Sequence, residues 1–505
     1  MRNRQIETLG RVQLQDETTG AILLVPQPSS DPNDPLNWSN PFKLYVAVLT
    51  CAALTWVNFF AAGPSAVLVE IVIDLFGAYP PDPSNAATLT PASKVAFASG
   101  VAKAALLFST ASMAAGLSNL LWVPVAVKYG RRLVYTLSFL AFGFCCIWSA
   151  RATSYGSLLA SRIIAAWFAG SAECVAPITI ADIFFLHERG RMTAMYSAAL
   201  SGGAALGPLV SGVMSISQTW RTFHYLCAAL VLATTALVFL TMPETAYHRH
   251  IDPREEDSHG KEKEPSVSQV ERIQISHFPK KKPFTQRMVF NRSLLTQESI
   301  WKIALRPVPI LLLPPVMWST VSFGVGIGIF VVMGTTGATA FSQVYRFTVW
   351  QVGLVWLGSF VVNLLGMPFG GYFSDWVANR ATVKNGGVRE PEMRLPAVSI
   401  AMVSSAAIGI SIVYTIDCYR PIAGEVVVSQ VAFKSIITFL MSFYANPWVY
   451  RDGYAGAFTA MAALSFVILA LWVPLYIWGT QIRHATLNWR VMQVAHWDAD
   501  RETGE

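Results

Sequence analysis

The chain has 505 residues, of which 53% are hydrophobic and only 13% are charged. A soluble domain carries about 25% charged residues, so this composition excludes an ordinary globular protein, and the high apolar content excludes intrinsic disorder. A helical membrane protein remains, because the apolar residues form long runs and do not alternate with polar ones.

A helix needs about 20 apolar residues to cross a bilayer. Eleven runs meet this requirement, at 43–69, 96–126, 132–150, 157–181, 192–215, 222–242, 307–333, 345–373, 395–416, 425–446 and 454–479. They predict a tail (1–42), a six-helix bundle (43–243), a polar loop (244–303), a second bundle (304–480) and a final tail (481–505).

The formal charge of +7 indicates orientation, because Lys and Arg collect in cytoplasmic loops. With the N-terminus inside, the inside segments hold 25 basic residues through the eighth run, and the outside segments hold 4. The ninth run, 395–416, corresponds to about 33 Å of helix and predicts one crossing. Eleven crossings put the last tail outside, but the charge rule favours the inside, so its side stays open.

Several motifs occur in a fixed order along these elements. They are DPNDPLNW (31–38), WVPVAVKYGRR (122–132), ADIFFLHERGR (181–191), GAALGPLVSG (203–212), MPETAYHR (242–249), GGYFSDW (370–376), NGGVREPEMRLP (385–396) and YANPW (444–448). Together they resemble the major facilitator superfamily, and within it the fungal drug:proton antiporter branch. The resemblance implies an all-α, two-bundle fold of twelve helices around a central cavity, both termini inside, and a monomer. The plasma membrane is the default location, with the vacuolar membrane as an alternative.

The second half departs from this pattern. The family has two helices between a segment like PEMRL and one like TIDCY, whereas this chain has one apolar run there, 395–416. An error in the gene model and a shortened protein both remain open explanations.

The fifth run carries Gly203, Gly207, Pro208 and Gly212. Glycines let another helix approach closely, and proline removes a backbone donor and bends the helix. The resemblance makes this the antiporter motif of the family. Ordinary helix packing is the alternative.

Two loops match a gate motif of the family in part. Gly130, Arg131 and Arg132 match in the first half, and Gly371 and Asp375 match in the second. The resemblance implies a cytoplasmic gate closed by carboxylate–guanidinium pairs. The alternative explanation for the two arginines is that cytoplasmic loops are generally rich in Lys and Arg, whether or not they form a gate.

Charges inside a span are expensive and usually functional. Glu173 lies near mid-depth of the fourth run, and Arg162 precedes it by eleven residues, which places both on one helix face, about 16 Å apart. A desolvated carboxyl binds a proton more readily than one in water, so Glu173 is a proton-coupling candidate. A structural ion pair with a neighbouring helix is the alternative. The resemblance assigns Arg162 an assisting role in proton transfer.

Other polar and aromatic side chains in the spans are candidates for the cavity. They are Trp56, Asn58, Phe59, Trp318, Phe323, Asn363 and Lys434. Lys434 lies at mid-depth and suits either an anionic substrate or a carboxylate partner. For the two asparagines, hydrogen bonding between helices is the default role.

The sequence therefore predicts a proton-coupled exporter of small organic molecules such as drugs, toxins or secondary metabolites. One alternative is a proton symporter or facilitator for nutrient or polyamine uptake. The other is a non-transporting or truncated membrane protein. Expected partners are the bilayer and a small-molecule substrate, not nucleic acid. No cofactor or metal is expected besides the proton gradient, because no Walker A or metal-binding motif occurs, and no enzymatic activity is expected.

Overall fold

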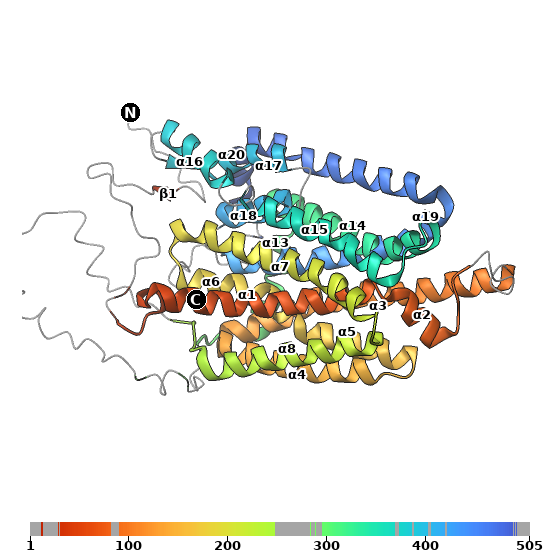
Figure 1. The fold of residues 1–505 in the computed structure, drawn as a ribbon. Coiled ribbons are helices and arrows are strands. Elements are labelled where there is room, and N and C mark those ends of the chain that lie inside the picture. The colour runs from red at the N-terminus through yellow and green to blue at the C-terminus, as the bar shows by residue number, and fades with distance from the viewer. Residues whose placement is uncertain are drawn as a thin grey trace, which may run out of the picture.

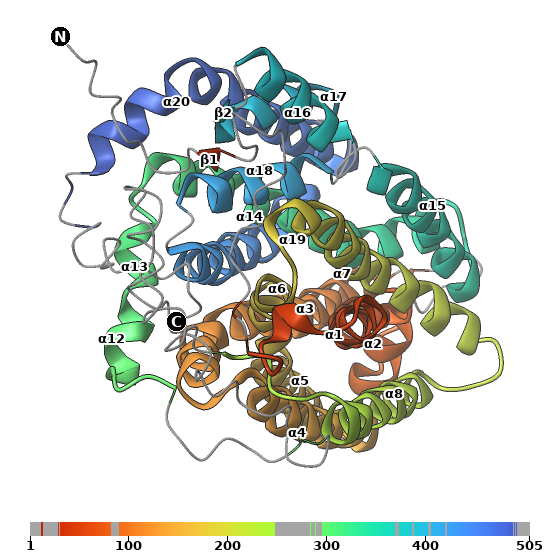
Figure 2. The same ribbon diagram turned by 90° about the vertical axis from the view of Figure 1, so that its left-hand side faces the viewer.

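A computed structural model of the protein describes residues 12–13, 29, 31–81, 90–247, 283, 288, 295–368, 373–385, 388–401, 406–419, 422–487, 489 and 491. Long helices dominate and run side by side (Figure 1). Viewed along the helices, they form two groups, the first half of the chain and the second (Figure 2). The all-α, two-bundle prediction is confirmed.

The first bundle contains the helices of residues 40–241. They are α1 (Asn40–Ala62), α2 (Leu68–Phe76), α3 (Pro91–Tyr129), α4 (Arg131–Arg151), α5 (Tyr155–Ala169), α6 (Ser171–Ile183), α7 (Leu186–Met214) and α8 (Trp220–Thr241), with single turns η1 (Pro35–Asn37) and η2 (Gly63–Ser65). α5 and α6 together form the fourth span, Tyr155–Ile183.

The second bundle is less regular. Its elements are α12 (Ile300–Leu305), α13 (Pro307–Ile310), α14 (Pro314–Val344), α15 (Val349–Pro368), α16 (Ser374–Lys384), η6 (Pro391–Arg394), α17 (Pro396–Ala401), α18 (Ala406–Cys418), α19 (Ala423–Ala470) and α20 (Trp472–Leu487). Gly453 has φ 72°, which divides α19 at a sharp bend. The tenth and eleventh apolar segments are therefore Ala423–Val449 and Arg451–Thr486.

The helices follow the eleven predicted runs. Among the described residues, nine helices are long and apolar enough to cross a membrane, and two shorter apolar helices lie at Val349–Val362 and Ala407–Cys418. Each of the eleven falls within one predicted run or overlaps it.

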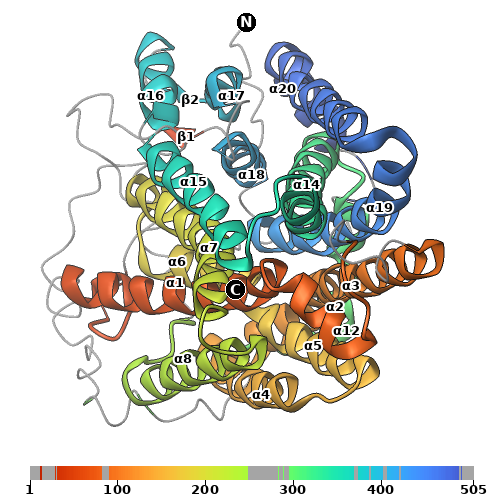
Figure 3. The same cartoon turned by 45° about the vertical axis from the view of Figure 1, so that its right-hand side comes forward.

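The ninth run does not cross, so the prediction of a single crossing there is wrong. Arg394 and Asp417, which flank the run, form an ion pair with 2.9 Å between Nε and Oδ2. A straight helix of this length would hold its ends about 33 Å apart. The two ends of this run therefore lie close together, and its two described helices, α17 and α18, pack against each other (Figure 3).

Contacts between distant segments place β1 and the end of α20 on one side of the bundle. In the N-terminal tail, β1 (Val12–Gln13) pairs antiparallel with β2 (Val388–Arg389). Just after β2, Glu392 forms an ion pair with Arg483 near the end of α20. α20 thus ends on the side where β1 and β2 lie, which agrees with the side that the charge count favours for the last tail.

The two bundles meet along two helix pairs, α3 with α19 and α7 with α15. α15 packs closely on α7 and has few contacts with α14 of its own half. Its outward side carries exposed apolar side chains such as Leu354, Val361 and Leu365. In a membrane these side chains contact lipid.

Candidate functional site

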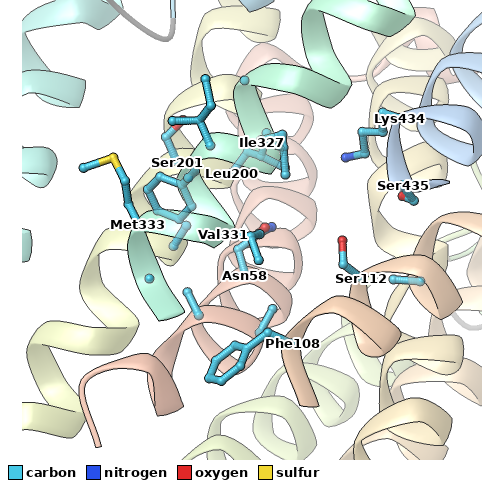
Figure 4. Close-up of a pocket in the computed structure, with 18 of the residues that line it drawn as sticks. Asn58, Phe108, Ser112, Leu200, Ser201, Ile327, Val331, Met333, Lys434 and Ser435 are labelled. Atoms are coloured by element: carbon cyan, nitrogen blue, oxygen red, sulfur yellow. The ribbon is translucent and has the colours of Figure 1, made fainter. Parts of the chain in front are cut away.

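A cavity of about 530 Å³ lies between the two bundles. This volume lies in the range of about 300–1,000 Å³ that is usual for small-molecule sites. Its polar and charged lining residues are Asn58, Ser65, Ser112, Arg162, Glu173, Ser201, Ser322, Ser359, Lys434, Ser435 and Ser465. Its apolar lining includes Phe60, Phe108, Leu200, Ile327, Phe330, Val331, Met333 and Trp356. Figure 4 shows Asn58 and Lys434 on different sides of this space.

An ion pair joins the two bundles in the cavity. Lys434 Nζ of α19 lies 3.1 Å from Glu173 Oε2 and 3.2 Å from Oε1 of α6. The side chains are only 5% and 13% exposed, and Nζ lies 4.1 Å from the centre of the Phe323 ring. A low-dielectric surrounding strengthens this attraction and makes loss of either charge costly.

Arg162, on α5, lies fully buried against the same cavity. Its Nε donates to the carbonyl oxygen of Leu107 at 3.1 Å, and its Nη2 donates to that of Ala61 at 3.0 Å. Its Cζ lies 5.0 Å and 5.1 Å from the ring centres of Phe60 and Phe108. Arg162 and Glu173 thus both face the cavity, as their spacing predicts.

Three aromatic cavity candidates lie elsewhere. Trp56 donates from Nε1 to Thr234 Oγ1 of α8 at 2.9 Å, and Phe59 stacks on Phe223 inside the first bundle. Trp318 is buried and donates to the carbonyl oxygen of Ile468. These side chains pack within their own bundles and are not among the lining residues.

The remaining cavity candidates divide as follows. Asn58 and Lys434 line the cavity, while Phe323 lies beside Lys434 without lining it. Asn58 also donates to the carbonyl oxygen of Leu54 at 3.0 Å within α1. The side chain of Asn363 lies outside the described part of the chain.

The predicted gate of the first half contains carboxylates that sequence reasoning did not name. Arg131 Nε lies 3.1 Å from Asp182 Oδ2 at the end of α6. Glu244 accepts the backbone N–H groups of Arg131 and Arg132 at 2.8 Å and 3.3 Å, a favourable place for an anion at the start of α4. Gly130 has φ 103°, and a Cβ there would lie 2.3 Å from the Glu244 carboxylate, so glycine is required.

A matching cluster lies in the second half. Arg394 lies 2.9 Å from Asp375 and 2.9 Å from Asp417, through Nη2 and Nε. Asp375 is the residue around which the sequence predicts a latch, and the other two were not singled out. Gly371 lies outside the described residues.

A further ion pair holds the end of the chain. The Arg483 guanidinium donates from Nε and Nη2 to the two Glu392 oxygens, each at 2.8 Å. The side chains are 0% and 6% exposed. A Cβ on Gly479 would lie 2.6 Å from the Glu392 carboxylate, so this glycine makes room for the pair.

The glycines of α7 lie where two neighbouring helices approach closely. A Cβ on Gly203 or Gly207 would lie 2.3 Å or 2.4 Å from a carbonyl oxygen of α1. A Cβ on Gly212 would lie 2.8 Å from the Cα of Gly353 on α15, and the Pro208 carbonyl would lie 3.0 Å from a Cβ on Gly353. The motif thus packs α7 against both bundles.

We predict that Gly207→Ala destabilises the protein by about 1–3 kcal/mol, because the new methyl group collides with backbone. Gly202→Ala, next to the motif on the same helix, is the matched control, since its Cβ would meet only Phe360 at 3.9 Å. Unfolding of the detergent-solubilised variants by heat compares the two. Equal unfolding temperatures would contradict the close packing of α7 on α1.

Signals for the missed residues exist in the sequence. Asp182 and Glu244 each lie at the end of an apolar run, inside motifs of the family. Glu392 and Arg394 lie in the PEMRL segment, and Asp417 lies in TIDCY. Their partners lie far away in the chain, and spacing along the sequence carries no information on such pairs.

Two helical bundles that enclose a small-molecule cavity within the membrane define a membrane transport protein. The model of the Major Facilitator Superfamily matches residues 48–468. The chain belongs to this family, and it is a multi-pass integral membrane protein.

Two relatives and one solved structure are similar to this chain. The uncharacterised MFS-type transporter C1271.10c of Schizosaccharomyces pombe is 24% identical, over 92% of this chain and 89% of its own length. The efflux pump FUB11 of Gibberella fujikuroi is 33% identical over 126 residues, 25% of this chain and 22% of the pump. The human organic anion transporter MFSD10 has a TM-score of 0.52 at 14% identity, over 86% of this chain and 100% of its own.

Proposed function

We propose that this protein is a proton-coupled exporter of small organic molecules, of the fungal drug:proton antiporter branch, working by alternating access. The observation that carries the proposal is the Glu173–Lys434 ion pair, which joins the two bundles inside the cavity at 3.1 Å. A proton that neutralises Glu173 removes the attraction between the bundles. Proton binding to Glu173 is then coupled directly to rearrangement of the two bundles.

Two observations support export over uptake. The glycine motif of α7, which the resembling antiporter branch shares, packs α7 against both bundles. A relative with local similarity is named as an efflux pump. In this proposal the ion pairs of Arg131 and Arg394 form the cytoplasmic gate, because Arg131 begins α4 and Arg394 follows β2, which pairs with β1 of the N-terminal tail.

The cavity and its Glu173–Lys434 ion pair favour a transporter over a non-transporting relative. Described residues of both bundles line this cavity. The plasma membrane is the proposed location and a monomer the proposed state.

The test uses the intact protein in vesicles with the cytoplasmic face outward. Three probes share one aromatic body and differ in charge: naphthoate, naphthamide and a naphthylmethyl-trimethylammonium ion. We expect an acidic interior to drive accumulation of at least one probe, and a protonophore to abolish it. Protein-free vesicles correct for passive movement of the weak acid.

Accumulation driven by an acidic exterior would show proton symport and would support the uptake alternative. Accumulation of all three probes that ignores the gradient would contradict proton coupling.

A further inference from the structure

The charges of the cavity do not balance. Its described lining contains two cations, Arg162 and Lys434, and one carboxylate, Glu173. The carboxylate lies within 3.2 Å of Lys434 through both oxygens. The second cation is therefore left without a carboxylate partner among the described residues.

Arg162 keeps hydrogen-bonding capacity that the described protein does not use. Two of its three nitrogens donate to carbonyl oxygens of α1 and α3, while Nη1 is buried without a hydrogen-bond partner. The residue is only 1% exposed. A guanidinium stays protonated in proteins, and a buried charge without a counter-ion is costly.

The surrounding residues fix the guanidinium in place. Ala61 is the second-last residue of α1, so its carbonyl oxygen is one of those that the helix leaves unpaired. A cation is favourable at the C-terminal end of a helix. The rings of Phe60 and Phe108, at 5.0 Å and 5.1 Å, contribute cation–π attraction. The group is preorganised, and its third nitrogen, Nη1, is buried beside the cavity without a hydrogen-bond partner.

The other lining residues indicate the chemistry of the rest of the ligand. Phe108, Leu200, Val331 and Met333 provide an apolar wall, and Ser112 and Asn58 provide polar groups (Figure 4). An apolar body with one anionic group matches this distribution. A cationic ligand would meet a cavity that already holds an excess of positive charge.

We propose that Arg162 is the anion-binding residue of the cavity, and that the substrates are small organic anions with an apolar or aromatic body, carboxylates in particular. Nη1 is covered in this structure, so a carboxylate accepts its hydrogen bond after neighbouring side chains have moved aside, and the apolar body fills the space toward α14. Along the fourth span, Arg162 lies eleven residues from Glu173, about 16 Å of helix. The ligand anchor and the ion pair between the bundles are thus separate parts of one cavity. This proposal names the substrate class of the proposed transporter, and it rests on that proposed function, because a bound anion is a substrate only if the protein transports it.

Equilibrium binding to the purified full-length protein in nanodiscs tests the proposal without any gradient. The probes are naphthoate, its neutral amide and the trimethylammonium analogue. We expect the wild-type protein to bind naphthoate at least about tenfold more tightly than the amide, because a charged hydrogen bond in a buried site is strong. The cationic probe should bind most weakly.

In Arg162→Gln, naphthoate affinity should fall at least about tenfold, whereas affinity for the amide should change little. Arg162→Lys should retain part of the preference, since it keeps the charge, and serves if the first variant fails to fold. Arg151→Gln, an exposed arginine on α4, is the matched control for net charge and should bind all three probes as the wild type does.

An unchanged affinity for naphthoate in folded Arg162→Gln would overturn the proposal, and so would a preference for the cation. Anion binding without gradient-driven transport would instead contradict the proposed function alone. Gradient-driven transport of a cation or neutral probe without anion binding would contradict the substrate class alone.

Discussion

Glu173→Gln is expected to abolish gradient-driven accumulation while leaving exchange of the probe down its own gradient. Glutamine keeps the size and hydrogen-bonding capacity of the side chain, but it does not bind and release a proton. Separation and closure of the two bundles would then no longer depend on pH. Transport in vesicles, with and without a pH gradient, measures both quantities in one preparation.

A double variant separates coupling from structure. Glu173→Gln alone leaves Lys434 as a buried charge without its partner, which costs stability. Adding Lys434→Gln removes that charge as well, so folding is restored while proton binding stays absent. If the double variant accumulated the probe in response to a gradient, the pair would be structural and the coupling role of Glu173 would be wrong.

Glu298→Gln is the matched control for these variants. It also weakens an ion pair between a glutamate and a basic residue, since Glu298 Oε1 lies 2.7 Å from Arg306 Nη2. Glu298 does not line the cavity. Its variant should therefore accumulate the probe as the wild type does.

Glu392→Gln is expected to lower the free energy of unfolding by about 3–5 kcal/mol, the cost of leaving one buried charge unpaired. Arg483 is fully buried and its two bonds to Glu392 are both 2.8 Å long. Arg483→Gln should destabilise the protein by a similar amount, because it leaves the buried Glu392 carboxylate without its partner. Unfolding of solubilised protein by denaturant or heat measures the change.

The exposed pair of Arg451 and Asp452 provides the contrast. Its nitrogen–oxygen distance is 3.5 Å, and its side chains are 86% and 43% exposed. Such a pair is worth less than about 1 kcal/mol, so Asp452→Asn should leave stability nearly unchanged. Equal losses in the two variants would contradict the role assigned to the buried pair.

The sequence was sufficient for most of the fold. Apolar run length predicts helices wherever a bilayer demands full internal hydrogen bonding, and each of the eleven runs contains or overlaps a helix. It failed at 395–416 because hydropathy measures only apolar length. An ion pair between Arg394 and Asp417 holds the two ends of this run together, and hydropathy does not describe such a contact.

The candidate site was predictable only in part. Arg162 and Glu173 lie on one span, so helix geometry places them on a common face. Lys434 is 261 positions from its partner, and nothing in one chain aligns the two bundles. Trp56 and Phe59 show the same limit: in a helix that is apolar on every side, no periodicity tells the cavity face from the packed face.

One helix of the second bundle, α18, is shorter than a bilayer core. It has 13 residues, about 20 Å of helix, against a hydrocarbon core of about 30 Å. A hydrophobic segment shorter than the core is accommodated by local thinning of the bilayer or by its flanking residues. The second bundle is therefore sensitive to bilayer thickness at α18.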